Sequence, residues 1–367
     1  MSRSEPVPVS VLTGFLGAGK TTLLNRLLAE PALSGTGVVV NEFGDVGIDA
    51  ALIAATAGSG VIELAGGCLC CAVRGELVDT LLDLAAAMQA GSTRRLDRLV
   101  IETSGLADPA PVVAALMADP RLAAAYRLDS VICVLDAVNG AASLAAHEES
   151  RRQAALADLV VLTKGDAAEP EARAASLVAL RALNPEAPVL DAAAGEAGAA
   201  VLIPAPGRRG PTFARHLAAV EPGDHHDHAH HHGHSHHHSH AHGGTSLSSV
   251  SIRWDVPLAP GAAYGFAESL VALLGSRLLR FKAVVDLQGE PERPLVLHAV
   301  AGRLDGPQRL EGSLGGAGSR FVAIGEGLDE RVIRDLFAAF AGVPRVDAPD
   351  RAAVEHNPLA VPNFTFR

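Results

Sequence analysis

Between residues 7 and 190, apolar residues occur in short, nearly unbroken runs separated by stretches rich in Ala and Leu. Unbroken apolar runs are typical of strands that are covered on both faces, and the intervening stretches are typical of helices. This alternation predicts an α/β domain with a mainly parallel sheet and helices on both faces. The expected strands are 7–13, 37–41, 98–102, 130–136, 158–163 and 187–190, and the main helices are 21–30, 76–90 and 169–183.

The pattern changes abruptly after residue 222. Residues 225–242 contain twelve histidines in eighteen positions and no apolar face that could be buried. We therefore expect a first domain at 1–222, a disordered His-rich linker at 223–245, and a loose tail at 344–367. Residues 246–343 contain expected strands, a helix that stops at Gly275 and an amphipathic helix that starts at Asp329, which predicts a smaller α+β domain.

Composition narrows the classes of function. The formal net charge of −11 argues against a nucleic-acid or acidic-membrane partner. Four cysteines in 367 residues do not form a disulfide framework, which favours a reducing compartment. We see neither a cleavable leader nor an apolar run of about 18 residues, and so expect a soluble, cytoplasmic protein without a membrane partner.

A phosphate-binding loop is predicted at residues 14–21, "GFLGAGKT", which fit G-x-x-x-x-G-K-[ST] between an expected strand and an expected helix. Backbone N–H groups and the helix N-terminus would face phosphate oxygens, Lys20 would contact the β- and γ-phosphates, and Thr21 would hold Mg²⁺. The alternative is a strand-to-helix turn that binds nothing. The expected nucleotide contacts are Gly14, Gly17, Ala18, Gly19, Lys20, Thr21 and Thr22.

Two later motifs extend the nucleotide site. In "IETSG", Glu102 closes an expected strand and is placed to hold Mg²⁺ through water, with Lys20 as the second catalytic candidate. An ordinary strand-end carboxylate is the alternative. In "VVLTKGD", the Asp166 carboxylate can accept hydrogen bonds from guanine N1 and N2, while Lys164 would pack along the base. The sequence therefore predicts a guanine nucleotide.

The segment "GGCLCC" places Cys68, Cys70 and Cys71 within four positions. Thiolates suit Zn²⁺ and Cu⁺, and Co²⁺ fits a tetrahedral site. Three protein ligands would leave a position open, as a metal carrier requires. A vicinal disulfide, a redox switch and buried packing cysteines are the alternatives. Cys133, in the middle of an expected strand, is predicted to be a packing residue.

Other candidate ligands flank the cysteines. Glu42 and Asp45, in "NEFGDVGID", could contact Mg²⁺ or a carried metal, or could belong to a solvated acidic loop. The His tract could be a plain linker or a weak metal-loading arm. His147, His216, His298 and His356 show no readable spacing and are assigned surface or structural roles. The candidate weak ligands in the tract are His225, His226, His228, His230, His231 and His232.

Five ordered motifs, "GFLGAGKTT", "NEFG", "GGCLCC", "ETSG" and "TKGD", resemble those of the CobW-type P-loop GTPases of the SIMIBI class. The second domain also looks like that of this family. One departure is Thr163, which stands where GTPases most often have Asn. The resemblance implies a GTP-hydrolysing metallochaperone that uses GTP and Mg²⁺, and it supports Glu42 as a ligand of the carried metal.

The expected mechanism is a coupled switch. GTP and Mg²⁺ would order the loops that carry Glu42 and the cysteines, and slow hydrolysis would release Zn²⁺, or alternatively Co²⁺, to a client metalloprotein. The sequence identifies neither the client nor the oligomeric state, and it allows a homodimer. A non-catalytic metal buffer and a P-loop kinase of a small molecule are the competing functions.

Overall fold

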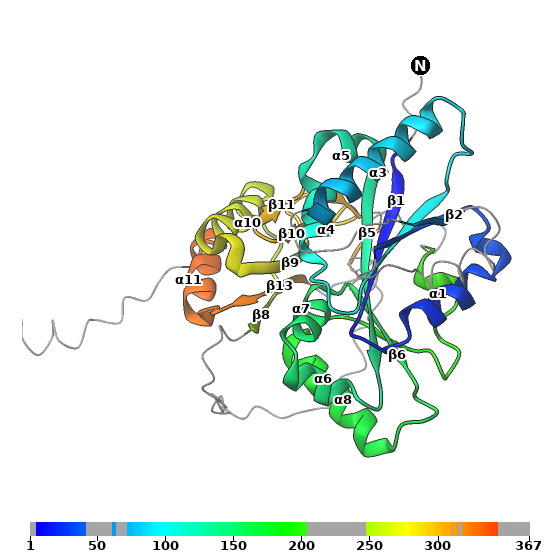
Figure 1. The fold of residues 1–367 in the computed structure, drawn as a ribbon. Coiled ribbons are helices and arrows are strands. Elements are labelled where there is room, and N and C mark those ends of the chain that lie inside the picture. The colour runs from blue at the N-terminus through cyan, green and yellow to red at the C-terminus, as the bar shows by residue number, and fades with distance from the viewer. Residues whose placement is uncertain are drawn as a thin grey trace, which may run out of the picture.

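The computed structural model describes residues 5–41, 61–63, 72–203, 247–310, 312–314 and 318–343. Two sheets, each with its own helices, lie side by side (Figure 1). The first is a seven-stranded parallel sheet in the order β3-β2-β4-β1-β5-β6-β7. Its strands are β1 (Val7–Thr13), β2 (Thr36–Asn41), β3 (Val61–Glu63), β4 (Arg98–Thr103), β5 (Tyr126–Asp136), β6 (Leu159–Thr163) and β7 (Val189–Asp191).

Helices cover both faces of this sheet, as the sequence predicts. Consecutive residues of β2 show why the apolar runs are unbroken: Val39 packs toward α3 and α4, whereas Val38 and Val40 pack toward α1 on the other face. The helices are α1 (Lys20–Leu28), α3 (Ala72–Gln89), α4 (Ala110–Ala118), α5 (Pro120–Ala125), α6 (Gly140–Ala146), α7 (Glu148–Leu156) and α8 (Pro170–Leu183), with 3₁₀ turns η1 (Pro31–Leu33) and η2 (Ala199–Val201).

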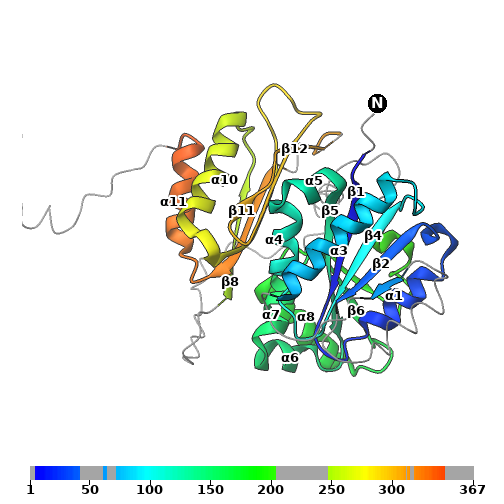
Figure 2. The same cartoon turned by 45° about the horizontal axis from the view of Figure 1, so that its top comes forward.

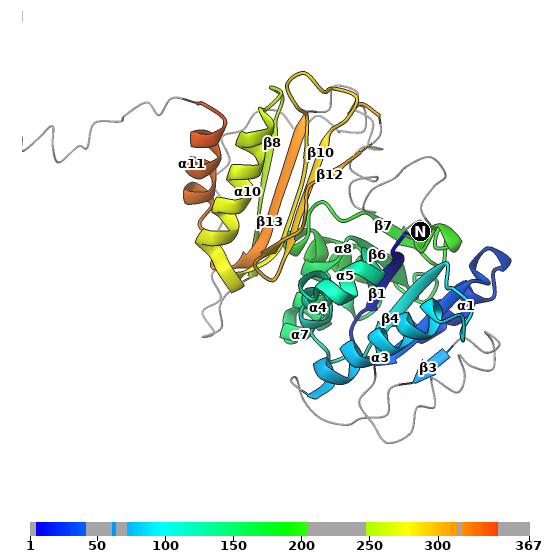
Figure 3. The ribbon, with the colours of Figure 1, turned by 90° about the horizontal axis from the view of Figure 1, so that it is seen from above.

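The second domain is a six-stranded antiparallel sheet with two helices on one face (Figure 3). Phe266 of α10 and Phe337 of α11 meet Phe321 of β13 in edge and tilted ring contacts, which form the centre of this core. The elements are β8 (Leu247–Trp254), α10 (Pro260–Leu274), η3 (Gly275–Arg277), β9 (Leu278–Val285), β10 (Leu295–Val300), β11 (Arg303–Leu304), β12 (Gln308–Arg309), β13 (Ser319–Glu326) and α11 (Glu330–Phe340).

The other face of the second sheet meets the first domain at α7 (Figure 2). Leu279 of β9 and Val322 and Ile324 of β13 pack with Ala155 of α7. Next to this cluster, Asp158 forms ion pairs with both Arg280 and Lys282, and all three side chains are buried. The two domains are thus joined by an apolar contact with a buried ionic cluster beside it.

The predicted fold class is confirmed, with shifts at the ends of elements. Strand β5 begins at Tyr126, four residues before the expected start, because residues 126–129 continue the pairing with β1. Strand β3 was not predicted, since it has only three residues. The predicted domain boundaries near residues 222 and 245 lie outside the described residues. No helix in the described part of the chain is long and apolar enough to cross a bilayer.

Candidate functional site

The loop from Gly14 to Gly19 joins β1 to α1 and has the backbone of a phosphate cradle. Gly14, Gly17 and Gly19 have φ values of 145°, 69° and 94°, which favour glycine. A Cβ on Gly14 would lie 2.4 Å from the Val134 carbonyl oxygen, so no larger residue fits there. The Lys20 ammonium donates to the carbonyls of Gly14, at 2.9 Å, and Phe15, at 3.3 Å. The cation is therefore held within the loop that would surround the phosphates.

A pair of oxygen-bearing side chains lies beside this loop. Thr21, in the first turn of α1, donates its hydroxyl to Oε1 of Glu102 over 2.8 Å, although the two residues are 81 positions apart. Glu102 is only 1% exposed and lies near the carboxyl end of β4, next to β1. A hydroxyl and a carboxylate are the hard oxygen ligands that Mg²⁺ prefers, so the residues fit this ion. The structure thus brings together the two residues that the sequence assigns to Mg²⁺.

Thr163 links the predicted base-binding tetrapeptide to the phosphate loop. Its hydroxyl lies 2.6 Å from the Ala18 carbonyl oxygen and 3.2 Å from that of Leu135. Gly19 lies against the same side chain. Although Thr163 departs from the Asn most often found there, its side chain ties two segments of the nucleotide site together.

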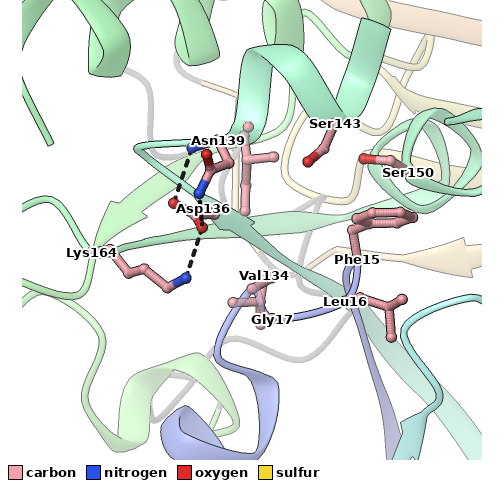
Figure 4. Close-up of a pocket in the computed structure, with 12 residues that line it drawn as sticks. Phe15, Leu16, Gly17, Val134, Asp136, Asn139, Ser143, Ser150 and Lys164 are labelled. Atoms are coloured by element: carbon pink, nitrogen blue, oxygen red, sulfur yellow. Dashed lines mark hydrogen bonds and ion pairs between the residues drawn. The ribbon is translucent and has the colours of Figure 1, made fainter. Parts of the chain in front are cut away.

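Lys164 is held by a carboxylate that sequence reasoning missed. Its ammonium lies 2.7 Å from Oδ2 of Asp136, at the end of β5 (Figure 4). Asp136 also accepts hydrogen bonds from the N–H groups of Val138 and Asn139. Burial tends to raise the pKa of Asp136, but these hydrogen bonds, that of Lys164 first, hold the pKa below its usual value. A buried strand that ends in Asp was the available sequence signal.

Two pockets flank the phosphate loop. One, of about 390 Å³, is lined by the start of α1, by Thr163, Lys164 and Asp166, and by residues 192–193. This volume lies within the range of about 300–1,000 Å³ that is typical of small-molecule sites. Thr22 and Asp166, two of the predicted nucleotide contacts, both line it. The second pocket, of about 250 Å³, lies between the start of the loop and α6 (Figure 4).

The loop after β7 is held in place by charged side chains, including two arginines that the sequence did not single out. Arg26 of α1 donates to the carbonyls of Ala192, at 3.2 Å, and Ala197, at 2.8 Å. Asp191 accepts from the N–H groups of Ala193 and Ala194 and pairs with Arg173 at 3.0 Å. This loop, which forms one wall of the larger pocket, is therefore anchored on α1 and α8.

The remaining candidates that the structure describes, Cys133, His298 and His147, contact other protein side chains. Cys133 is buried in the core, and burial raises the pKa of its thiol to about 12, so its predicted packing role is confirmed. His298 is buried with Nε2 2.7 Å from Oδ2 of Asp305. His147 is exposed, and its ring stacks on Phe15 of the phosphate loop with the ring centres 4.4 Å apart.

The predicted carrier-metal ligands lie outside the described residues. These are Glu42, Cys68, Cys70, Cys71 and the six tract histidines, and Asp45 lies there as well. The elements that flank the first four are described: β2 ends at Asn41, β3 ends at Glu63, and α3 begins at Ala72. In the parallel register, Val40 of β2 pairs with Glu63 on one side and with Glu102 on the other.

Both domains match known family models. Residues 8–191 match "CobW/HypB/UreG, nucleotide-binding domain", and residues 247–341 match "Cobalamin synthesis protein cobW C-terminal domain". The zinc chaperone YjiA of Escherichia coli K12 is 33% identical over 342 residues, which cover 92% of this chain and 99% of that protein. The zinc chaperone CobW of Pseudomonas aeruginosa is 34% identical over 368 residues, or 91% of each chain.

Two solved structures match this chain over most of its length. The crystal structure of Zn(II)-bound YjiA GTPase from E. coli matches with a TM-score of 0.59 and 26% identity, covering 92% of this chain and 99% of that chain. A Zn(II)-bound variant of YjiA with one glutamate and two cysteines changed to alanine matches over the same shares with a TM-score of 0.63.

Proposed function

Because the chain belongs to the CobW family of P-loop GTPases, with both of its domains matched, we propose that it carries zinc under the control of GTP and delivers it to a client metalloprotein. Two relatives of more than 30% identity are zinc chaperones, and the YjiA GTPase binds Zn(II) in its crystal structure. The proposal assigns the metal to Cys68, Cys70 and Cys71 with Glu42.

The arrangement of strands at one edge of the first sheet supports this proposal most directly. Glu42 follows the last residue of β2, and the three cysteines fall between the end of β3 and the start of α3. Strand β2 lies between β3 and β4, which carries Glu102. Neighbouring strands are about 4.8 Å apart, so β3 and β4 are separated by about 10 Å. The strand ends that precede Glu42 and the three cysteines therefore both lie close to the nucleotide site.

Each residue of the nucleotide site has a role in this proposal. Lys20 neutralises the β- and γ-phosphates, Asp166 accepts hydrogen bonds from guanine, and Asp136 orients Lys164. Thr21 and Glu102 would hold Mg²⁺, which when bound offsets phosphate charge. The absence of a readable arginine finger predicts slow turnover to GDP and phosphate.

Coupling between nucleotide and zinc must be reciprocal. If GTP tightens zinc binding, zinc must tighten GTP binding by the same factor. A hundredfold change in affinity requires a coupling free energy of about 2.7 kcal/mol. The tract that contains His225, His226, His228, His230, His231 and His232 would load zinc weakly, and it would lose zinc below about pH 6.5 as the imidazoles protonate.

Zinc titration against a chromophoric chelator tests the proposal. Zinc affinity should be high with a non-hydrolysable GTP analogue and lower with GDP or without nucleotide. Cys70→Ser should lose tight zinc binding and retain GTP binding, whereas Cys133→Ala, the matched control, should retain both. Equal zinc affinity in all three nucleotide states would refute the coupling.

GTPase assays separate the competing functions. Phosphate release that is lost in Lys20→Ala supports the proposed GTPase cycle. Zinc binding without any GTP hydrolysis would indicate a metal buffer. Transfer of phosphate to a small acceptor, without free phosphate, would indicate a kinase.

A further inference from the structure

Helix α7 contacts three parts of the molecule that the nucleotide cycle would have to connect. It begins after His147, whose ring stacks on Phe15 of the phosphate loop. Its last two turns contact the segment that follows Glu102, and the opposite side of those turns contacts the C-terminal sheet (Figure 2). The helix therefore lies between the nucleotide site and the second domain.

The segment after Glu102 is packed directly on the phosphate loop. A Cβ on Gly105 would lie 2.8 Å from the backbone nitrogen of Leu16 and 2.9 Å from its Cα, so the two backbones are in contact. Glycine permits this close approach because it has no Cβ. A movement of either segment would therefore displace the other.

Gln153 of α7 fixes the far side of that segment. Its Nε2 donates to the carbonyls of Gly105, at 3.1 Å, and Ala107, at 3.0 Å. Gln153 has no exposed surface, and its Oε1 accepts no hydrogen bond from any described residue. A buried acceptor without a hydrogen-bond partner, such as this Oε1, costs free energy. The two hydrogen bonds that Nε2 donates to the loop carbonyls offset that cost.

The neighbouring residue, Arg152, connects the same segment to the second domain. Its guanidinium pairs with Asp108, at 3.3 Å, and with Glu326 of β13. Glu148, one turn earlier on α7, holds the guanidinium at 2.9 Å. Asp108 also accepts from the N–H of Ala110 at the start of α4. One cation thus joins the segment after Glu102 to the C-terminal sheet.

The C-terminal sheet also holds the end of α7. The Lys282 ammonium donates to the carbonyl of Ala157 at 2.7 Å, directly after the helix. Asp158 pairs with Arg280 and Lys282 of the same strand. A shift of β9 relative to the first domain would therefore carry the end of α7 with it.

We propose that Gln153 is a positioning residue for GTP hydrolysis and that the C-terminal sheet sets its position through Glu326 and Arg152. Gln153 holds the backbone of residues 105–107 against the phosphate loop, next to Glu102. A partner that shifts the C-terminal sheet would therefore change the rate of GTP turnover. The proposal rests on the GTPase activity of the family and is independent of zinc delivery.

Steady-state GTP hydrolysis by the full chain tests the role of Gln153. Gln153→Met keeps the side-chain length and removes both donors. We expect kcat to fall about tenfold while GTP affinity changes less than about twofold, since two hydrogen bonds that position the loop are lost. Ser130→Ala is the control, because the buried hydrogen bond to Ser10 that it removes involves neither a side chain of α7 nor the segment after Glu102, and it should leave kcat unchanged. An unchanged kcat in Gln153→Met, or an equal fall in the control, would overturn the proposal.

A double-mutant cycle tests the role of the second domain. Glu326→Gln should lower kcat about threefold in the native background and have little further effect in Gln153→Met, because both act on one segment. Independent, multiplicative effects would overturn the link.

Amide hydrogen exchange on the unaltered protein tests the same link without substitution. Residues 105–108 and 322–326 should change protection together between GTP analogue and GDP. A change in the first segment alone would overturn the link. A protein that binds no zinc but shows these results would contradict the proposed carrier function and leave this inference standing.

Discussion

Removal of the Asp158 carboxylate is the sharpest test of how the domains are held together. Asp158 is 1% exposed, and its Oδ1 pairs with Lys282 at 3.0 Å and with Arg280. Its Oδ2 accepts from the N–H of Val131 at 2.8 Å. Asp158→Asn keeps the shape of the side chain and leaves two buried cations without their shared anion.

The cost follows from the ionisation of Asp158. Burial tends to raise its pKa, but Arg280 and Lys282 lower it from 3.8 to about 2. A pKa lowered to about 2 corresponds to roughly 2–3 kcal/mol of stability, and Asn resembles the protonated form of Asp. Lys282 keeps the loss of stability from being larger. Burial already lowers the pKa of its ammonium to about 8, so in the variant this group can lose its proton and avoid being an unpaired buried charge. We therefore expect Asp158→Asn to cost about 3 kcal/mol at pH 7.

Urea unfolding monitored by tryptophan fluorescence measures this loss. The chain has one tryptophan, Trp254, whose ring lies 5.5 Å from that of Phe337 in the second domain. The pKa of Asp158 is lower in the folded protein than in the unfolded chain. Its contribution to the free energy of unfolding is therefore fully present above the pKa of the unfolded chain and is lost as the pH falls toward about 2. The stability difference between wild type and Asp158→Asn should therefore shrink by about 1 kcal/mol between pH 5 and pH 3.

Glu330→Gln is the control for this experiment. Its carboxylate pairs with Arg334 one turn along α11, and both side chains are exposed. Such pairs contribute about 0.3–0.5 kcal/mol, so the control should change stability little. A loss below about 1 kcal/mol in Asp158→Asn at pH 7, or a difference that does not shrink in acid, would refute the reasoning.

Three further predictions concern the nucleotide site and the core. Asp136→Asn should weaken binding of a fluorescent guanine nucleotide about fivefold, since the charge-assisted bond to the part-exposed Lys164 is lost; unchanged affinity would contradict its orienting role. Thr163→Val should lower the same affinity about tenfold, because the link to the Ala18 carbonyl is removed, and a wild-type titration curve would count against it. Cys133 should resist alkylation at pH 8 in the folded protein, since burial raises its pKa to about 12; modification detected by mass spectrometry at the denatured rate would contradict this.

Local patterns predicted the elements that surround the phosphate loop. The bounds of β1, Val7–Thr13, agree with the expected strand, because a long apolar run and the following glycines mark both ends. The cap at Asp329 was also predicted, and its side chain accepts from the N–H groups of Arg331 and Val332. Strand β3 was missed because Val61–Glu63 is too short to show a pattern and forms only beside β2.

The C-terminal sheet shows where sequence patterns mislead. In "LLRFKAVV", Arg280 and Lys282 alternate with apolar residues, as the outer face of a half-exposed strand does. Both cations are buried, because the first domain covers that face and supplies Asp158. The alternation of charged and apolar residues identified the two faces of β9. It contained no information on what covers the face that carries Arg280 and Lys282.

The sequence by itself determined the family, the α/β architecture and the phosphate loop, since each depends on neighbouring residues along the chain. Only the tertiary structure decided which distant groups meet: Thr21 with Glu102, Asp136 with Lys164, and Gln153 with the carbonyl of Gly105. These contacts depend on strand order and domain docking, which bring together residues separated by 28 to 81 positions. Local propensity acts over a few residues, whereas the order of packed strands sets the contacts that position the nucleotide site.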